Sequence, residues 1–224
     1  IMCFCDCGRT IVYQEREVPS DPDSNTNDEK AYDYYAQAFS LFRVQEDETK
    51  DEQLQYRLGM MALYGKGTQV NQPLAAEYFE KSVEQGNENA KSALARLYLK
   101  GDGIEKNIDK AVKLLTELSE KDDKAQYTLG RLYLKGEDVR KDTEKAVHYL
   151  NLSAEQGNQF AQYTLGRLYL SGMDVPCDTI KGVHYLQASA DQQNQFARYA
   201  LGVYYIHNGQ NKEGAKLLTL AAEQ

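Results

Sequence analysis

YTLGRLYLKGED at 127–138 recurs as YTLGRLYLSGMD at 163–174, and related phrases begin at Tyr56, Ser92 and Tyr199. Each phrase contains a central Leu-Gly or Leu-Ala pair. The second residue of the pair lies at Gly59, Ala95, Gly130, Gly166 and Gly202, so the repeats are separated by 36, 35, 36 and 36 residues. Self-similarity at this period is typical of stacked helical repeats, because each unit buries its apolar face only against its neighbours. We therefore predict an all-α, right-handed superhelical solenoid of about five antiparallel helix pairs.

Within each unit, apolar residues recur at helical spacing. In the third unit Ala125, Leu129 and Leu132 lie at i, i+4 and i+7 and form one buried face. Gly130 lies inside the same predicted helix, where glycine costs roughly 1 kcal/mol against alanine. Small residues also recur in the second helix of each pair, at Ala75, Ala111, Ala146, Gly182 and Gly214. The two sets of small residues predict that the helices of a pair cross closely.

Polar residues that cap helices recur at the expected start of the second helix. They are Asn71, Asn107, Asp142 and Asp178. The second helix is expected to end at a residue in the left-handed conformation, which glycine adopts without strain. Gly86 and Gly157 fit that position, and Asp122 tolerates the conformation. Gln193 is more strained in it, so we expect the fourth turn to differ.

The chain divides into two parts by composition. Residues 1–28 are rich in Pro, Asp, Ser and Asn in their second half, which predicts an irregular or flexible lead-in that contains cysteines. We predict one solenoid domain at 29–224, opening with a capping helix at 29–47, and the charged run EDETKD at 46–51 is expected to be an exposed linker. Five helix pairs follow at about 52–86, 87–122, 123–157, 158–193 and 194–224.

The run A-x-Y-x-L-G-x-L-Y-x-x-G, followed by Lys-Ala, Tyr-Leu and A-E-Q-G-N, closely resembles the Sel-one-like repeat (SLR), a relative of the tetratricopeptide repeat (TPR). The units at 125–158 and 161–194 carry it most fully, and the resemblance covers about 50–224. EKAYDYYAQAF at 29–39 also aligns with EKAVHYLNLSA from Glu144 onwards, as a degenerate second helix. The resemblance implies a scaffold or adaptor for protein–protein interaction, with no shared active site. The repeats are also similar to the tails of mobilisation proteins of Gram-positive bacteria.

A stripe of polar and basic residues is predicted on the first helix of each pair. Thr128, Arg131 and Lys135 lie 3 and 4 residues apart, on the face opposite the buried leucines. In solenoids of this kind the first helices line the concave side, so Arg96, Arg131 and Arg167 are expected to form a ladder with steps of roughly 10 Å. Guanidinium groups bind carboxylates bidentately, and the ladder therefore suits an acidic peptide or a C-terminal carboxylate.

The alternative interpretation of the ladder is that each Arg pairs with a nearby acidic residue, such as Asp102 or Asp138, and serves solubility. Most tyrosines recur in register and are expected to pack between helices. Tyr64 and Tyr204 break that register, and we expect them to be exposed. The full set of candidate binding residues is Arg57, Tyr64, Arg96, Lys100, Arg131, Lys135, Arg167 and Tyr204.

Composition argues against several other classes of function. The net charge of -8 opposes general binding to a phosphate backbone, and no apolar run reaches the roughly 18 residues of a membrane span. Cys3, Cys5 and Cys7 lack the second cysteine pair of a structural zinc site, so we expect no metal. His148 and His184 are expected on the surface. We find no catalytic or phosphate-binding motif and expect neither catalytic residues nor a cofactor.

The sequence therefore predicts a non-catalytic scaffold that binds a partner protein or an acidic peptide segment in its concave groove, with no direct nucleic-acid contact by this segment. The alternative hypothesis is the repeat arm of a larger bacterial DNA-mobilisation or DNA-processing protein. The cytoplasm is favoured as the compartment, and the periplasm and the exterior stay open because a signal peptide upstream of Ile1 would not be visible. The oligomeric state is left open.

Overall fold

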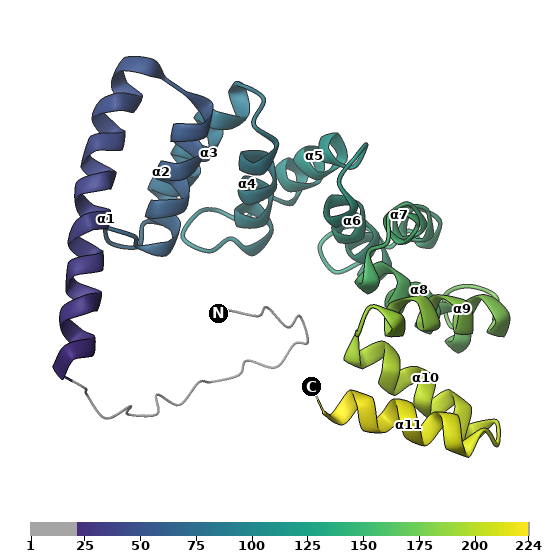
Figure 1. Cartoon of the computed structure of the whole chain (residues 1–224). Helices are drawn as coiled ribbons and strands as arrows, with labels where there is room; N and C mark the ends of the chain where they lie inside the picture. The colour runs from purple at the N-terminus through teal and green to yellow at the C-terminus, as the bar shows by residue number, and fades with distance from the viewer. Residues whose placement is uncertain (1–21, 224) are drawn as a thin grey trace.

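A computed structural model describes residues 22–223, with side chains from Glu29 onwards, and this part of the chain forms α-helices without strands (Figure 1). The first helix, α1, spans Pro22–Thr49. Five antiparallel pairs follow: α2 (Glu52–Tyr64) with α3 (Gln72–Glu84), α4 (Glu88–Lys100) with α5 (Ile108–Leu118), α6 (Asp123–Lys135) with α7 (Thr143–Glu155), α8 (Gln159–Ser171) with α9 (Thr179–Asp191), and α10 (Gln195–His207) with α11 (Asn211–Ala222). The predicted all-α solenoid of helix pairs is confirmed.

The pairs follow one another along an arc (Figure 1). We call the first helix of each pair an A helix (α2, α4, α6, α8 and α10) and the second a B helix. In the middle of the array α4, α6 and α8 lie on the inner side of the arc, and α5, α7 and α9 lie on the outer side. All five A helices are 13 residues long, so residues at the same position along them are equivalent.

The helices of a pair cross at the recurring small residues. A methyl group added at Gly130 would lie 2.7 Å from Leu150 Cγ and 3.2 Å from the Ala146 carbonyl oxygen. The same substitution at Gly166 would lie 2.7 Å from Leu186 Cγ. These distances are shorter than ordinary carbon–carbon contacts of about 3.5–4.0 Å. The close crossing predicted from the sequence is therefore present.

Helix caps follow the expected pattern at the start of four B helices. The side chains of Asn71, Asn107, Asp142 and Asp178 each accept a hydrogen bond from the third backbone N–H of the helix. Gly86 and Gly157 have positive φ angles of 95° and 90° in the turns that end their B helices, as predicted. Gln193 also has a positive φ, of 67°, although its turn was expected to differ. The prediction for Asp122 is wrong, because its φ is -96° and it caps α6 instead. The step from Ala95 to Gly130 is 35 residues instead of 36, and the turn before α6 is one residue shorter as a result.

The first helix is longer than expected at both ends. Residues 22–28, predicted as part of the irregular lead-in, begin α1, and the helix continues through the expected linker to Thr49. Glu46 is only 5% exposed, and its Oε1 accepts a hydrogen bond from Gln55 Nε2 at 2.9 Å. The expectation of an exposed linker is therefore wrong at Glu46, which joins α1 to α2. Cys3, Cys5 and Cys7 lie outside the described residues.

Two polar contacts that sequence reasoning did not single out recur inside the pairs. Buried Ser153 donates a hydrogen bond of 2.7 Å to the Asp123 carbonyl oxygen, and Gln156 Nε2 donates one of 2.8 Å to Gln126 Oε1. The same two contacts, 30 residues apart, are made by Ser82, Gln85, Ser189 and Gln192. They tie the end of each of these B helices to the start of its own A helix.

The loop between α2 and α3 packs directly on α1 at Gly67, which has a φ of 70°. A Cβ atom there would overlap the backbone of Tyr35 and Ala36, whereas a Cβ atom at Gly157, with a φ of 90°, meets no heavy atom within 4 Å. We expect Gly157→Ala to lower the free energy of unfolding by about 1 kcal/mol, from backbone strain alone. Gly67→Ala should cost at least about 1 kcal/mol more because α1 must move.

Urea denaturation, with hydrogen exchange of α1 measured in parallel, checks this expectation. Exchange in α1 should accelerate in Gly67→Ala and stay unchanged in Gly157→Ala. An equal loss of stability in the two variants, with α1 equally protected in both, would show that the Gly67 contact does not hold α1 in place.

Candidate interaction surface on the A helices

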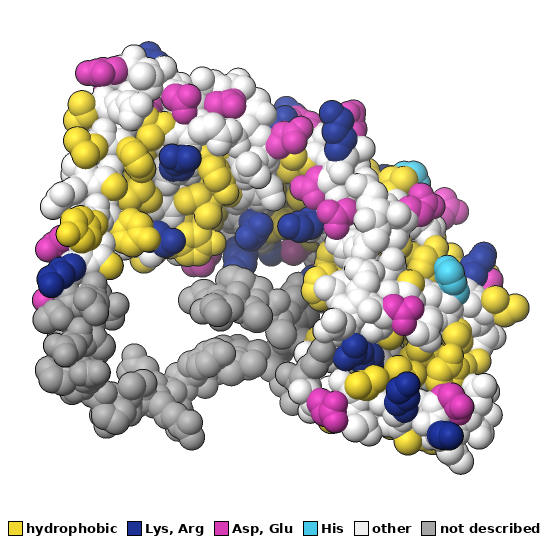
Figure 2. Space-filling model, viewed as in Figure 1, with side chains coloured by type: hydrophobic (Ala, Val, Ile, Leu, Met, Phe, Trp, Pro, Cys, Tyr) yellow, Lys and Arg dark blue, Asp and Glu magenta, His cyan; other side chains and the backbone are white. Residues whose placement is uncertain are grey.

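The arginine ladder occupies one position on three successive A helices. Arg96, Arg131 and Arg167 are each the ninth residue of their helix, on α4, α6 and α8. Arg96 and Arg167 are exposed, and Arg131 is half-buried. Figure 2 shows Lys and Arg side chains gathered along the inner edge of the arc in the region of α4 and α6. The structure therefore places the three residues in register on the helices that line the inner side.

Two of these arginines lie on tyrosine rings of their own helix. Arg131 Cζ lies 5.5 Å from the centroid of the Tyr127 ring, and Arg167 Cζ lies 5.7 Å from that of Tyr163. Arg167 Nη1 also donates a hydrogen bond of 3.3 Å to the Tyr163 hydroxyl. A contact of this kind restricts the position of the guanidinium group.

Asp138, one of the acidic partners suggested for the ladder, forms an ion pair with a lysine. Its Oδ1 accepts a hydrogen bond from Lys106 Nζ at 2.5 Å, and an equivalent ion pair joins Lys141 to Asp174. These contacts link successive loops between A and B helices. Asp138 therefore stabilises neighbouring repeats through Lys106.

The remaining candidates differ in exposure. Arg57, Lys100 and Lys135 are exposed, and Tyr64 is 48% exposed at the thirteenth position, which Lys100 and Lys135 share. Tyr204 is half-buried, and its ring packs against the apolar cluster of α9 and α10. The expectation that Tyr204 is exposed is therefore not met. It occupies the tenth position, which buried leucines hold in other repeats: Leu97 at 5% and Leu168 at 7% exposure.

Charge is distributed unevenly between the A helices and the rest of the chain, a feature that sequence reasoning missed. The A helices contain nine cationic and three acidic residues, although acidic residues outnumber Lys and Arg by 34 to 26 overall. The cations are Arg57, Lys91, Arg96, Lys100, Lys124, Arg131, Lys135, Arg167 and Arg198. The acidic residues, Glu52, Glu88 and Asp123, each stand first in their helix, where they complement the helix dipole.

Lys91 and Arg198 are among the cations that have partners inside the array. Lys91 forms an ion pair of 2.9 Å with Glu117, and Arg198 donates hydrogen bonds to the carbonyl oxygens of Ala190 and Leu220. Beyond their first residues, the A helices contain no acidic side chain. The excess of cationic residues on the A helices is present in the sequence, but it can be counted only once the helix boundaries are known.

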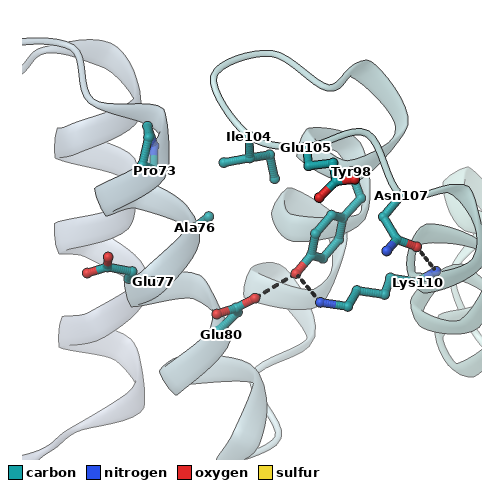
Figure 3. Close-up of a pocket in the computed structure, with 9 residues that line it drawn as sticks. All are labelled: Pro73, Ala76, Glu77, Glu80, Tyr98, Ile104, Glu105, Asn107 and Lys110. Atoms are coloured by element: carbon teal, nitrogen blue, oxygen red, sulfur yellow. Dashed lines mark hydrogen bonds between the residues drawn. The ribbon is translucent and has the colours of Figure 1, made fainter.

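A pocket lies between α3 and the α4–α5 pair (Figure 3). Tyr98, which is 8% exposed, donates a hydrogen bond of 2.6 Å to Glu80 Oε1 and accepts one of 3.2 Å from Lys110 Nζ. The same Lys Nζ lies 5.0 Å from the centroid of the Tyr98 ring. Equivalent contacts join Lys145 to Tyr133 at 5.3 Å and Lys181 to Tyr169 at 5.5 Å. The Tyr–Lys contact therefore joins the A helix to the B helix in three successive pairs.

The Tyr98 contact predicts how stability depends on pH. Burial raises the pKa of Tyr98, and the hydrogen bond to Glu80 raises it further. The folded protein therefore holds this proton more tightly than the unfolded chain, so this contribution is complete below about pH 10 and is lost above it. In urea denaturation at about pH 8 and about pH 11, Tyr98→Phe should lose less stability on the alkaline side than the native chain.

Tyr199→Phe is the matched control for this measurement, because Tyr199 is 61% exposed. It should keep the alkaline loss of the native chain. An unchanged loss in Tyr98→Phe would contradict the assignment.

Among the side chains of residues 29–223, no group of three His, Cys, Asp or Glu could hold a metal ion. No helix within residues 22–223 is long and apolar enough to cross a membrane. Cys177 is exposed and forms no disulfide, and His148 and His184 are exposed as predicted.

Comparison with protein families identifies the repeats. A family model of the Sel1 repeat matches 21–41, 53–87, 89–123, 123–158, 159–194 and 195–224. Because these matches cover most of the chain, the protein belongs to the Sel1 repeat family. The match at 21–41 agrees with the degenerate repeat recognised at 29–39. Comparison with curated proteins gives no match.

Solved structures share the fold. A protective antigen of uropathogenic Escherichia coli strains, displaying an SLR fold, aligns with a TM-score of 0.75 and 24% identity over 91% of this chain and 46% of its own. A Sel1 repeat protein from Oxalobacter formigenes aligns at 0.74 and 23% identity, over 94% and 91%. An immunity protein from Pseudomonas aeruginosa aligns at 0.52 and 24%, over 76% and 64%. The chain thus spans about half the length of the E. coli antigen.

Proposed function

We propose that this chain is a non-catalytic interaction scaffold that holds an acidic segment of a partner protein against the inner surface formed by its A helices. Sel1 repeat proteins are generally scaffolds for protein–protein interaction. The observation that carries the finer proposal is the charge of the A helices, nine cationic against three acidic residues in a chain of net charge -8.

This distribution favours an acidic ligand on the A helices over other surfaces of the molecule. An acidic segment is repelled by the predominantly acidic remainder of the chain and attracted to the inner surface. Bound there, its carboxylates can form charge-assisted hydrogen bonds with Arg96, Arg131 and Arg167. The charge difference therefore supports both the position proposed for the ligand and the negative charge proposed for it.

Rigidity supports the same proposal. The A helices are held by close crossings to their B helices and by the recurring Ser and Gln hydrogen bonds. A surface fixed in this way loses little conformational entropy when a partner binds. The partner segment then bears most of the cost of becoming ordered.

Fluorescence anisotropy with a labelled oligoglutamate peptide tests the proposal. Replacing Arg96, Arg131 and Arg167 together by Gln should weaken binding at least about tenfold, since each lost contact is a charge-assisted hydrogen bond. The matched control replaces the exposed lysines Lys113, Lys121 and Lys216 by Gln, which removes the same charge outside the A helices. It should change affinity less than about threefold.

Equal losses in the two triple variants would overturn the proposal, because binding would then follow net charge alone. Tight binding of a labelled DNA oligonucleotide with a steep salt dependence, without binding of the peptide, would favour the repeat arm of a DNA-processing protein instead.

A further inference from the structure

Two similar clusters of side chains connect the last three A helices. In the first, the Phe160 ring of α8 lies 6.0 Å from the Tyr127 ring of α6, which in turn lies under Arg131. The second cluster repeats this arrangement one unit later: Phe196 of α10 lies 6.0 Å from Tyr163 of α8, which lies under Arg167. We call these two Phe–Tyr–Arg clusters the rungs; their aromatic rings are tilted by 33° and 40°. Each rung combines an apolar ring and a cation in one continuous contact.

The phenylalanines of the rungs are exposed, and the fold does not require an aromatic residue at their position. Phe160 is 47% exposed and Phe196 is 38% exposed, each as the second residue of its helix. The same position holds exposed polar residues in the first three A helices: Gln53, Asn89 and Lys124. Large aromatic rings at this position are therefore a property of the C-terminal half of the array.

The helices of the rungs carry one acidic residue, Asp123, whose Oδ2 accepts a hydrogen bond of 2.6 Å from Asn158 Nδ2. Neither α8 nor α10 contains an Asp or Glu residue, and the single acidic residue of α6, Asp123, begins its helix. Tyr199, at the position of Tyr127 and Tyr163, adds a ring that is 61% exposed. This part of the A-helix surface is consequently aromatic and cationic together.

We propose that the rungs bind an extended partner segment in which an acidic residue is paired with an aromatic or aliphatic neighbour, one pair per rung. The proposal rests on the proposed function, because it names the ligand of the same surface. The rings of each rung join two successive A helices, and we take the step between rungs as close to the distance between packed helices, about 10 Å. An extended chain advances about 3.3 Å per residue. The pairs should therefore recur about every third residue of the partner.

The chemistry of each rung accounts for both halves of such a pair. The tyrosine ring supports one face of the guanidinium, and the N–H groups at the guanidinium edge suit a bidentate contact with a carboxylate. The neighbouring phenylalanine gives the apolar side chain of the partner a ring to cover. Because the ring and the cation are already in contact, the rung is organised before the partner arrives.

Aromatic rings beside arginine also occur where proteins bind single-stranded nucleic acid. That ligand needs a basic groove that follows the backbone from phosphate to phosphate. On α8 and α10 the Lys and Arg residues are Arg167 and Arg198, and Arg198 is hydrogen-bonded to backbone carbonyls. The rungs therefore fit a segment with spaced carboxylates better than a continuous row of phosphates.

Fluorescence anisotropy with labelled peptides tests the rungs. The main probe repeats Glu-Phe-Ser four times. Its isomer has the same composition with the Glu-Phe pairs clustered at one end, and a third peptide repeats Glu-Ser-Ser. The native chain should bind the periodic probe at least about fivefold tighter than the clustered isomer, because only the former reaches both rungs.

The decisive variant is Phe160→Ser/Phe196→Ser, which should weaken binding of the periodic probe about tenfold and leave binding of Glu-Ser-Ser unchanged. Tyr34→Ser/Ile180→Ser is the matched control, since these side chains are 70% and 85% exposed outside the A helices. It should bind all three peptides as the native chain does. Arg131→Lys/Arg167→Lys, which keeps the charge, should weaken the periodic probe several-fold and provides a second test if the serine variant does not fold.

The outcomes separate this inference from the proposed function. If the Glu-Ser-Ser peptide binds through the arginines but the Phe160 and Phe196 substitutions leave the periodic probe unaffected, the rungs are overturned and the acidic-segment proposal stands. If none of the peptides binds the native chain, both proposals fail. If labelled oligothymidylate binds more tightly than every peptide and loses affinity in Phe160→Ser/Phe196→Ser, the rungs belong to a nucleic-acid site and the peptide proposal is overturned.

Discussion

The close crossing of each A helix with its B helix is the constraint on which the rest of the structure depends. At Gly130 and Gly166 a single added methyl group would enter the leucine of the facing B helix, and Gly182 faces the backbone of Gly166 in return. This approach buries Leu150 and Leu186 completely. The close approach recurs at Gly59 and Gly202. Successive pairs therefore stack in a similar way, and α4, α6 and α8 come to line the inner side of the arc (Figure 1). The alignment of equivalent surface residues follows from that stacking.

The buried face and the exposed face of each A helix contribute differently to the structure. Leu129 and Leu165 are fully buried and hold the array together, whereas Arg131 and Arg167 lie two positions further along the same helices and contact the aromatic rings of the rungs. A surface residue can therefore change without loss of the fold, as Val203 shows where arginine stands in other repeats. This independence explains how one repeat family can present different chemistry to different partners.

The period, the small residues and the caps made the helix pairs predictable, because each depends on residues close together in the sequence. The errors arose where distant residues decide the outcome. Glu46 is charged and was expected in a linker, but Gln55 of the next helix supplies its partner. The error at Asp122 has a local cause instead: its turn is one residue shorter than in the other repeats, so Asp122 caps α6. Tyr204 is half-buried because its position faces the core, and the rungs join residues 33 apart, such as Tyr127 and Phe160, whose contact depends on how two A helices pack.

Site-specific photo-crosslinking in the native host tests most directly whether an acidic partner lies on the inner surface. A photoreactive amino acid would replace exposed Ser171 on the A helix α8 or exposed His184 on the B helix α9 of the same pair. The account predicts that one acidic partner peptide is crosslinked from position 171 and not from position 184, and that the arginine substitutions abolish the adduct. An adduct from position 184 alone would place the partner on the outer face and contradict the account.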